Sequence, residues 1–420
     1  MKADDHQLFI KNARIFTPLS SPEWHASWKT ATYEPGAMLV ANDLITAVDP
    51  EADVLKKLDP AKPLTTVDAA GKLVTPGFVD CHTHPVFHHL RAHEFEMRVK
   101  GADYVEIAKA GGGIRFSVRD LRQASAEQLE HVLLKRLDRF IEFGTTTIEA
   151  KSGYGLSVKD EIKSLAVLRA ADATHPLDLV PTFLGAHEVP DEYRHDRERY
   201  IELVIQEMLP QVVENQLARF IDVFCENHVF TDMQAERILS AGKAKGLIPK
   251  IHADQLHDSG GAQVAANVGA VSADHLEHTP ETLDEKLFEA QVVPVMLPGA
   301  DFFLSSSHYG PARRMIRNQL PVAIATDFNP GTCMSESMPM MLTLACLQLK
   351  MAPAEAWVAS TYHAAKAIGC DGMVGTLEVG KQADFVIWDA DSELEIPYHF
   401  GVNLVQKVFK KGIKVYDKKA

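Results

Sequence analysis

The stretch VTPGFVDCHTHPVFHHLRAHEF, residues 74–95, joins an apolar run to five histidines, His82, His84, His88, His89 and His93. His82 and His84 stand two residues apart at the end of the run, so in an extended segment both side chains point to the same side. Two imidazoles placed in this way can share one cation, but a single H-x-H pair is a weak signal. Whether it marks a metal site depends on what the rest of the chain brings to the same place.

The middle of the chain repeats one unit, a short β-branched run followed by an amphipathic helical stretch. Eight such runs occur, at 73–80, 145–150, 177–186, 220–226, 247–253, 269–274, 292–297 and 321–326. Strands that alternate with helices pair in parallel, and eight repeats predict an α/β fold closed into a (β/α)8 TIM-like barrel. An open doubly wound sheet is the competing architecture, but no G-x-G-x-x-G follows the first run.

The two ends of the chain have a different texture, of short alternating strands broken by turn residues. LFIKNARIFTP and GAMLVANDLITAVDP show it near the start, and ADFVIWDA and VQKVFKKGIKVYD near the end. Neither end is large enough to bury a core alone, so we expect them to join as one small β-sandwich beside the barrel. The predicted domains are residues 1–73 and 379–420 for the two parts of the sandwich, and 74–378 for the barrel.

Catalytic groups of such barrels gather at the carboxyl ends of the strands. Six predicted strands end there in an imidazole or a carboxylate, namely His82 with His84, His187, Glu226, His252, His275 and Asp327. Three of the imidazoles, those of His82, His84 and His252, together with the Asp327 carboxylate suit Zn²⁺ or Fe²⁺ and leave a position for water. If these four residues were merely capping or solvated groups, the same placement would have to recur on three strands by coincidence.

A cation that lowers the pKa of water to about 7 favours hydrolysis over redox or group-transfer chemistry. His275 ends a strand on the same face, which predicts a proton shuttle. Asp327 can both hold the cation and accept a proton from the water.

The bulk composition narrows the partners. The 420 residues are 46% hydrophobic and 24% charged, with a formal net charge of −14. Acids and bases are mixed along the chain, which argues against nucleic acid or a membrane as partner but not against a small anionic substrate. No apolar stretch approaches the roughly 20 residues that span a bilayer, and the first residues lack a signal-peptide pattern. Five cysteines without a C-x-x-C pair predict free thiols and a cytoplasmic location.

Several longer strings resemble one known family. PGFVDCHTH, HAD and ATDFNPGT are similar to the amidohydrolase superfamily, in which a metal-bearing barrel is paired with a small β-sandwich. EFEMRVKGADYVEIAKAGGGI, EAKSGYGL, TFLGAHEVP, HADQL, SADHLEH and TDFNPGTC narrow the resemblance to the imidazolonepropionase family, over essentially the whole chain.

The resemblance implies the hydrolytic ring opening of 4-imidazolone-5-propanoate to N-formimidoyl-L-glutamate, the third step of histidine degradation. It implies one divalent or trivalent ion per chain, zinc or iron, held by His82, His84, His252 and Asp327. The implied substrate contacts are Arg91, Tyr154, His187, Gln255, Asn329, Gly331 and Thr332. We expect Arg91 and Tyr154 to hold the propanoate carboxylate, His187 to hold the ring carbonyl and Gln255 to bond a ring nitrogen. Water is expected to attack the ring carbon between the two nitrogens, and a homodimer is the default assembly.

Two features depart from the family pattern. His88, His89 and His93 occupy positions where the family usually carries small residues, and we expect them to be incidental loop residues. Related deaminases place a proton-carrying glutamate where this chain has Gln255, so the proton transfers should fall to His275 and Asp327. The triplet Gly111 to Gly113 marks either a moving loop over the site or a plain turn.

Three alternatives stay open from the sequence. A two-metal amidohydrolase of the dihydroorotase or hydantoinase type would use Glu226 with His252 and His275, although Lys151 lies on the wrong strand for a carbamylated bridge. A deaminase acting on a heterocycle would release ammonia. A non-catalytic metal-binding barrel would hold the cation and hydrolyse nothing.

Overall fold

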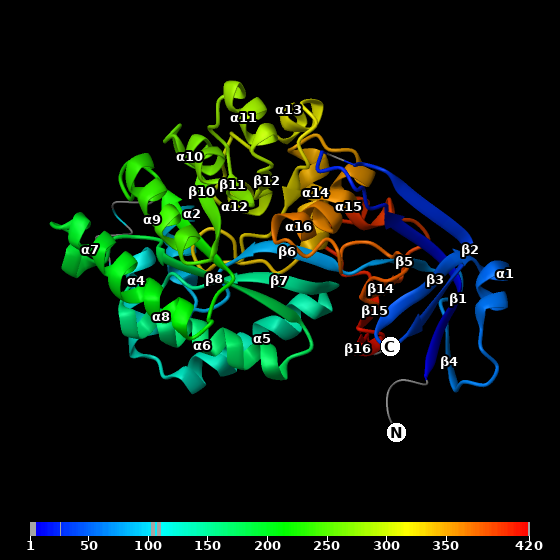
Figure 1. The fold of residues 1–420 in the computed structure, drawn as a ribbon. Helices are drawn as coiled ribbons and strands as arrows, with labels where there is room; N and C mark the ends of the chain where they lie inside the picture. The colour runs from blue at the N-terminus through cyan, green and yellow to red at the C-terminus, as the bar shows by residue number, and fades with distance from the viewer. Residues whose placement is uncertain (1–5, 26, 102–105, 107–110, 419–420) are drawn as a thin grey trace.

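The computed structural model describes residues 6–25, 27–101, 106 and 111–418, and two sheets organise these parts of the chain (Figure 1). One is an eight-stranded parallel sheet whose order follows the chain. Its strands are β6 (Phe78–Thr83), β7 (Thr145–Lys151), β8 (Asp178–Ala186), β9 (Phe220–Cys225), β10 (Ile248–Ala253), β11 (Ser272–His275), β12 (Val293–Met296) and β13 (Ala323–Ile324). The order and the parallel pairing confirm the predicted (β/α)8 architecture.

The sheet closes where the segment after β13 meets β6. Thr83 forms a parallel bridge with Phe328. The His84 amide donates to the Phe328 carbonyl over 2.8 Å, and the Asp327 amide donates to the His82 carbonyl over 3.1 Å. The last strand position therefore lies directly beside the first one.

Helices follow each strand of this sheet and cover its outer face (Figure 1). The larger ones are α2 (Ala92–Val99), α4 (Ile114–Gln123), α5 (Ala126–Glu142), α6 (Val158–Thr174), α7 (Arg197–Leu203), α8 (Leu209–Glu214), α9 (Asp232–Ala244), α10 (Gly261–Val268), α11 (Asp284–Glu289), α12 (Pro298–Phe303), α13 (Ala312–Arg317), α14 (Met338–Leu347), α15 (Pro353–Ser360) and α16 (Tyr362–Ala367). In α5, Ser125 and Gln128 form a capping box, and Leu129, Leu133 and Leu137 bury one face. Because helices cover the strands from outside, β6 and β7 are buried at every residue.

The second sheet combines the two ends of the chain, as predicted. Its order is β16-β15-β14-β5-β1-β2-β3, with β4 pairing with β1. The strands are β1 (Gln7–Pro18), β2 (Thr30–Ala41), β3 (Leu44–Pro50), β4 (Leu64–Asp68), β5 (Leu73–Pro76), β14 (Phe385–Trp388), β15 (Val405–Lys410) and β16 (Ile413–Asp417). The amino-terminal β5 pairs antiparallel with the carboxyl-terminal β14, and this pairing joins the two ends.

The run at 73–80, predicted as one strand, is in fact two strands that belong to different sheets. β5 ends at Pro76 and β6 begins at Phe78. At Gly77, which separates them, a Cβ atom would lie 2.3 Å from Oγ1 of Thr146, so no side chain fits at this crossing. The domain limits at 73/74 and 378/379 stay predictions.

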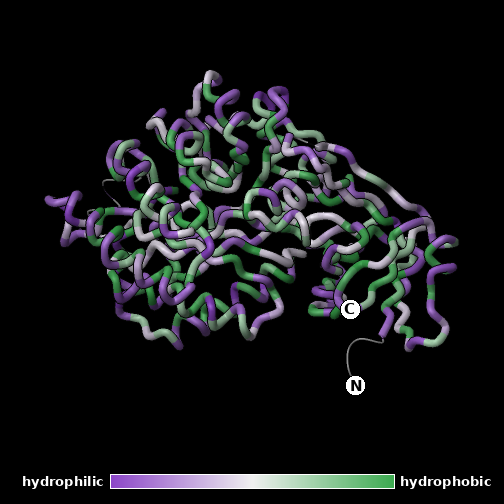
Figure 2. The backbone as a smooth tube through the Cα atoms, in the orientation of Figure 1, coloured by the Kyte–Doolittle hydropathy of each residue, from purple (hydrophilic) through white to green (hydrophobic). Residues whose placement is uncertain are grey.

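The two sheets are fastened together by charge and by aromatic packing. Nζ of Lys410 on β15 lies 2.6 Å from carboxylates of both Asp178 on β8 and Asp384. Phe78 stacks on Trp357 with ring centroids 5.2 Å apart, and Trp388 packs edge-on against both rings. Figure 2 shows hydrophobic residues along the inner strands and hydrophilic ones toward the outer ends of the helices. Within the described residues, no helix is both long enough and apolar enough to cross a membrane.

Candidate active site

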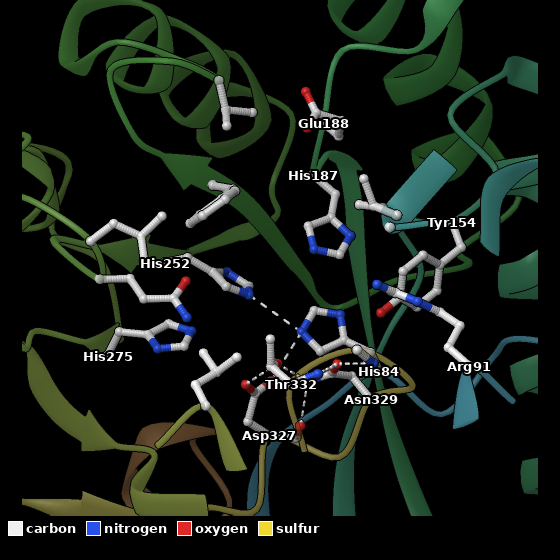
Figure 3. A pocket seen from close by; sticks show the side chains of 18 of the residues that line it. His84, Arg91, Tyr154, His187, Glu188, His252, His275, Asp327, Asn329 and Thr332 are labelled. Carbon is white, nitrogen blue, oxygen red and sulfur yellow. Dashed lines mark hydrogen bonds and ion pairs between the residues drawn. The ribbon is translucent and has the colours of Figure 1, made fainter. Parts of the chain in front are cut away.

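The predicted metal ligands converge at the carboxyl ends of the barrel strands. His82 is in β6 and His84 follows it, His252 is in β10, and Asp327 follows β13. All four residues are buried, none being more than 3% exposed. Figure 3 shows His84, His252 and Asp327 turned toward one another at the floor of a pocket.

Four of the distances between these ligand atoms are close to those expected around a tetrahedral ion. The Nε2 atoms of His82 and His84 are 3.2 Å apart, and those of His84 and His252 are 3.3 Å apart. Oδ1 of Asp327 lies 3.4 Å from Nε2 of His82 and 3.6 Å from Nε2 of His84. Bonds of 2.0 to 2.1 Å around a tetrahedral ion separate its ligands by roughly 3.3 to 3.4 Å. The residues present therefore fit a single cation.

Outer carboxylates fix two of these imidazoles with their Nε2 lone pairs inward. Nδ1 of His82 donates to Asp274 over 2.6 Å, and Nδ1 of His252 donates to Asp222 over 3.0 Å. Burial lowers the pKa of His82, His84 and His252, so the rings are neutral. Carboxylate–histidine pairs of this kind orient metal ligands, whereas Nδ1 of the third ring, His84, is buried without a partner.

Lys151 forms ion pairs with Asp222 and Asp274, the two carboxylates that contact the imidazoles, and with a third carboxylate, that of Glu149. Its Nζ lies 2.8 Å from both Glu149 and Asp222 and 3.6 Å from Asp274, and all four side chains are fully buried. Burial alone would lower the pKa of Lys151, but these carboxylates raise it above its usual value, so the side chain is an ammonium ion. An ammonium held in this way is not a carbamylated bridge between two metals.

Glu226, the other residue required by the two-metal alternative, lies outside the histidine cluster. Its carboxylate accepts from the amides of Leu256 and His257 and from the Ser259 hydroxyl. It therefore supports the loop after β10.

His275 lies beside the ligand cluster, at the end of β11. Its Nδ1 is 3.5 Å from Glu277, and its other ring contacts are His82 and His252. Burial would lower the pKa of His275, but the Glu277 carboxylate prevails and raises it to about 9. Burial raises the pKa of Asp327 to about 7 and, with the Glu277 charge adding to it, that of Asp301 to about 8. Two proton-carrying groups, His275 and Asp327, thus face the same floor.

A cavity of about 440 Å³ opens above this floor. Every predicted substrate-binding residue lines it, namely Arg91, Tyr154, His187, Gln255, Asn329, Gly331 and Thr332. Figure 3 shows Arg91 and Tyr154 together on one wall, across the cavity from His275. The roles of these residues stay proposals, but the structure brings all of them to one place.

Arg91 packs against the loop that contains Gly331. A Cβ atom at position 331 would lie only 2.7 Å from Nη1 of Arg91, so glycine makes room for the guanidinium. The same guanidinium pairs with Glu94 over 2.7 Å, and Glu94 also accepts from the Gly113 amide over 2.8 Å. Glu94 therefore connects the glycine triplet to the cavity wall; whether that loop moves stays a prediction.

The SGYG loop that carries Tyr154 is held from beneath by Glu161. This buried carboxylate accepts from the amides of Gly155 and Leu156 over 2.8 and 2.9 Å. The Gly153 carbonyl in turn accepts from Nδ1 of His187 over 2.9 Å. Burial lowers the pKa of His187 to about 3, so the ring is neutral and its Nε2 is an acceptor. The expectation that His187 donates to a ring carbonyl does not fit this tautomer.

Asn329 shapes the loop after β13. Its side-chain oxygen accepts from the amides of Gly331 and Thr332, each over 2.8 Å. Its side-chain nitrogen donates to the Asp327 carbonyl and to the Thr332 hydroxyl, each over 2.7 Å. The amide is therefore fully engaged in fixing the loop.

Several lining residues were missed from the sequence, including Glu94, Arg98, Glu188, Phe224 and His228. Arg98 donates to the Gly331 carbonyl over 3.3 Å, beside Arg91. Arg91, Glu94 and Arg98 follow the i, i+3, i+7 spacing of one helix face, a signal that could have identified them.

The chain is similar in sequence to proteins of known family. The family model described as "Amidohydrolase family" matches residues 73–415. The imidazolonepropionase of Symbiobacterium thermophilum is 48% identical over 412 residues, covering 98% of this chain and 97% of the relative. That of Solibacter usitatus is 48% identical over 415 residues, covering 98% and 99%.

Solved structures with the same fold include two deaminases. Escherichia coli guanine deaminase has a TM-score of 0.73 at 16% identity, covering 98% of this chain and 100% of that one. 5-Methylcytosine deaminase from Klebsiella pneumoniae has a TM-score of 0.75 at 17% identity, covering 98% of each chain. At these identities the likeness concerns the fold alone.

Proposed function

The chain belongs to the imidazolonepropionase family of amidohydrolases, and from this premise we propose its site and mechanism. Enzymes of this family hydrolyse a C–N bond of a cyclic substrate in histidine degradation. The substrate is 4-imidazolone-5-propanoate and the product N-formimidoyl-L-glutamate. The observation that carries the proposal is the convergence of three buried imidazoles and one buried carboxylate beneath a cavity that Arg91 and Arg98 help to line.

We propose that His82, His84, His252 and Asp327 hold one ion per chain, zinc or iron. When bound, the ion supplies Lewis acidity, which activates water and polarises the ring carbonyl. Asp274 and Asp222 keep two of the imidazoles in the tautomer that such a ligand needs.

We propose that Arg91 and Tyr154 bind the propanoate carboxylate at the wall opposite His275. Arg91 pairs with Glu94 through one terminal nitrogen and lines the cavity, and Arg98 adds a second positive charge to the same lining. His187, an acceptor at Nε2, suits a ring N–H rather than the carbonyl, and Gln255 can bond the other ring nitrogen. Asn329 holds Gly331 and Thr332 in the conformation that frames the ring.

The product requires attack at the ring carbonyl, which corrects the position expected above. N-formimidoyl-L-glutamate keeps the carbon between the two nitrogens bonded to both of them. Water must therefore add to the carbonyl carbon, and the bond from that carbon to its ring nitrogen must break. The carbonyl becomes the new α-carboxylate, and the released nitrogen takes a proton to become the terminal group of the formimidoyl unit.

Two side chains transfer the protons of these steps. Asp327 accepts one proton from the attacking water, and His275, whose Nδ1 lies 3.5 Å from Glu277, delivers one to the departing nitrogen. The new carboxyl group and Asp327 then lose their protons, one of which restores His275. Gln255 cannot exchange a proton at this place, so the work stays with these two residues.

The test is an ultraviolet assay with freshly generated 4-imidazolone-5-propanoate, with the product identified by mass. Metal analysis of the same sample, after dialysis against a weak chelator that removes loosely held ions, should find about one ion per chain, whereas two tightly retained ions would favour the two-metal alternative. Release of ammonia would instead indicate a deaminase. Wild-type protein that holds its metal but leaves the substrate intact would refute the proposal.

A homodimer and a cytoplasmic location, without nucleic-acid or membrane partners, remain proposals. The five free cysteines and the mixed surface charge support them. Light scattering on the purified protein tests the dimer directly.

A further inference from the structure

A second histidine–carboxylate cluster lies between β6 and α4, and none of its residues lines the cavity. Nδ1 of His89 is 2.7 Å and Nδ1 of His88 is 3.3 Å from the same oxygen, Oδ1 of Asp120. The other oxygen of Asp120 accepts from the His89 amide over 2.8 Å. The two rings face the carboxylate side by side, with centroids 3.9 Å apart.

The backbone beneath this cluster is held firmly. Arg136 on α5 donates to the carbonyls of Pro85 and His88 over 2.8 and 3.1 Å. Its guanidinium also lies 3.4 Å from the centroid of the Phe87 ring. The segment that presents the two histidines is therefore preorganised before any ligand arrives.

The charge state of the cluster also suits a cation. Burial works against the ionised form of Asp120, but contacts from His89 and His88 hold the pKa of its carboxyl below the usual value. The cluster thus offers one carboxylate and two imidazoles. Side chains of His88 and Asp120 are 18% and 15% exposed and that of His89 is 64% exposed, so water can complete a coordination shell.

We infer that His88, His89 and Asp120 form a second cation site, separate from the catalytic floor, that takes a transition-metal ion such as Zn²⁺, Ni²⁺ or Cu²⁺. Imidazole and carboxylate together select ions of this class over Mg²⁺ and Ca²⁺. One ligand atom from each residue lies within 4.8 Å of the others, and small shifts bring the contacts to the roughly 2.9 to 3.4 Å between neighbouring ligands of such an ion.

Exposure distinguishes this site from the buried one. An ion here exchanges with solvent and binds more weakly than an ion enclosed by His82, His84, His252 and Asp327. Because Arg91 follows His89 by two residues, an ion bound here also ties the segment that carries Arg91 to α4.

The test is calorimetric titration of Zn²⁺ into the metal-loaded protein. We expect one additional, weaker binding event per chain. His89→Ala and Asp120→Asn should each lower the Zn²⁺ affinity of that event by roughly tenfold or more. Loss of a residue that only supports a metal ligand already costs about tenfold in affinity, and loss of a ligand should cost at least as much. His93→Ala is the matched control, because His93 lies in the same segment but packs against Phe116, with centroids 5.7 Å apart, and it should titrate like the wild type.

A spectroscopic arm checks the ligands themselves. Cu²⁺ added to the loaded protein should show two coordinated nitrogens by electron paramagnetic resonance, and His89→Ala should show one. His88→Gln serves in place of His89→Ala if that variant unfolds, as judged by its thermal transition. Absence of the additional event, or identical titrations for wild type, His89→Ala and Asp120→Asn, would overturn the inference.

Discussion

Lys151→Met is the perturbation that tests the outer layer of the metal site most sharply. Lys151 contacts Glu149 and Asp222 at 2.8 Å, and Asp274 at 3.6 Å, in a fully buried setting. Methionine fills a similar volume but leaves the first two carboxylates without their cation. Breaking a buried ion pair on one side costs about 3 to 5 kcal/mol of the free energy of unfolding.

The same substitution should also loosen the metal. Asp222 and Asp274 hold His252 and His82. Burial works against the ionised form of Asp222, but His252 and Lys151 together hold its pKa below the usual value. Disturbing outer partners of ligating histidines typically costs about 10- to 100-fold in metal affinity, or about 1.4 to 2.7 kcal/mol. We expect Lys151→Met to fall within this range.

Lys250→Met is the matched control for this experiment. Lys250 is equally buried and contacts Ser272 at 2.5 Å and Asp274 at 3.6 Å, so it reaches only one of the two outer carboxylates. Denaturant unfolding of the metal-free proteins measures stability, and retention of metal against a chelator measures affinity. If both variants lose stability but Lys151→Met retains its metal as firmly as Lys250→Met, the lysine is only a packing element and the reasoning fails.

Three further predictions follow from the cavity and from the junction between the sheets. Arg91→Met should raise KM about 10- to 150-fold with little change in kcat, because a charged hydrogen bond contributes about 1.5 to 3 kcal/mol; an equal fall in kcat would contradict a purely binding role. Gly331→Ala should raise KM by displacing the Arg91 guanidinium, with thermal unfolding and metal content unchanged, and a normal KM would show that Arg91 can yield. Burial raises the pKa of Asp178, but the Lys410 charge outweighs burial, and the pKa in the folded protein is below its usual value. The Asp178 carboxylate therefore stabilises the fold fully above its unfolded pKa of about 3.9, and this stabilisation is lost as the pH falls through the lower pKa of the folded state. The stability advantage of wild type over Asp178→Asn, from denaturant unfolding, should therefore be full at pH 6 and shrink below about pH 4; a pH-independent difference would refute the linkage.

Much of the fold could be predicted because the barrel strands are buried on both faces. Such strands are continuous apolar runs, and a polar residue at the end of a run then stands out, as His252 and Asp327 do. The break at Gly77 could not be predicted, because it depends on Thr146, which is distant in the sequence and occupies the space a side chain would need. An apolar run gives no sign of which sheet each half joins.

The proposed metal ligands and several of the residues that line the cavity could be predicted from the sequence, but the carboxylates behind the proposed ligands were not identified. Asp222 and Asp274 are acids inside apolar strands, a signal that was available, since a buried charge needs a partner. Which histidine each aspartate contacts depends on the register between β9, β10 and β11, and this register is set by tertiary packing rather than by local sequence. The tautomer of His187 likewise depends on the Gly153 carbonyl of a neighbouring loop.

The proposed metal ligands lie on both sides of the junction where the barrel closes. Asp80 on the first strand accepts from the amide of Thr326 after the last one, 246 positions away along the chain, and His82 and Asp327 stand just beyond this clasp. Nearly the whole barrel must therefore be synthesised before His82 and Asp327 can come together. Metal binding should therefore occur late in folding. A chain whose barrel has not yet closed should be unable to retain the ion, although His82 and His84, in and just after its first strand, are already present.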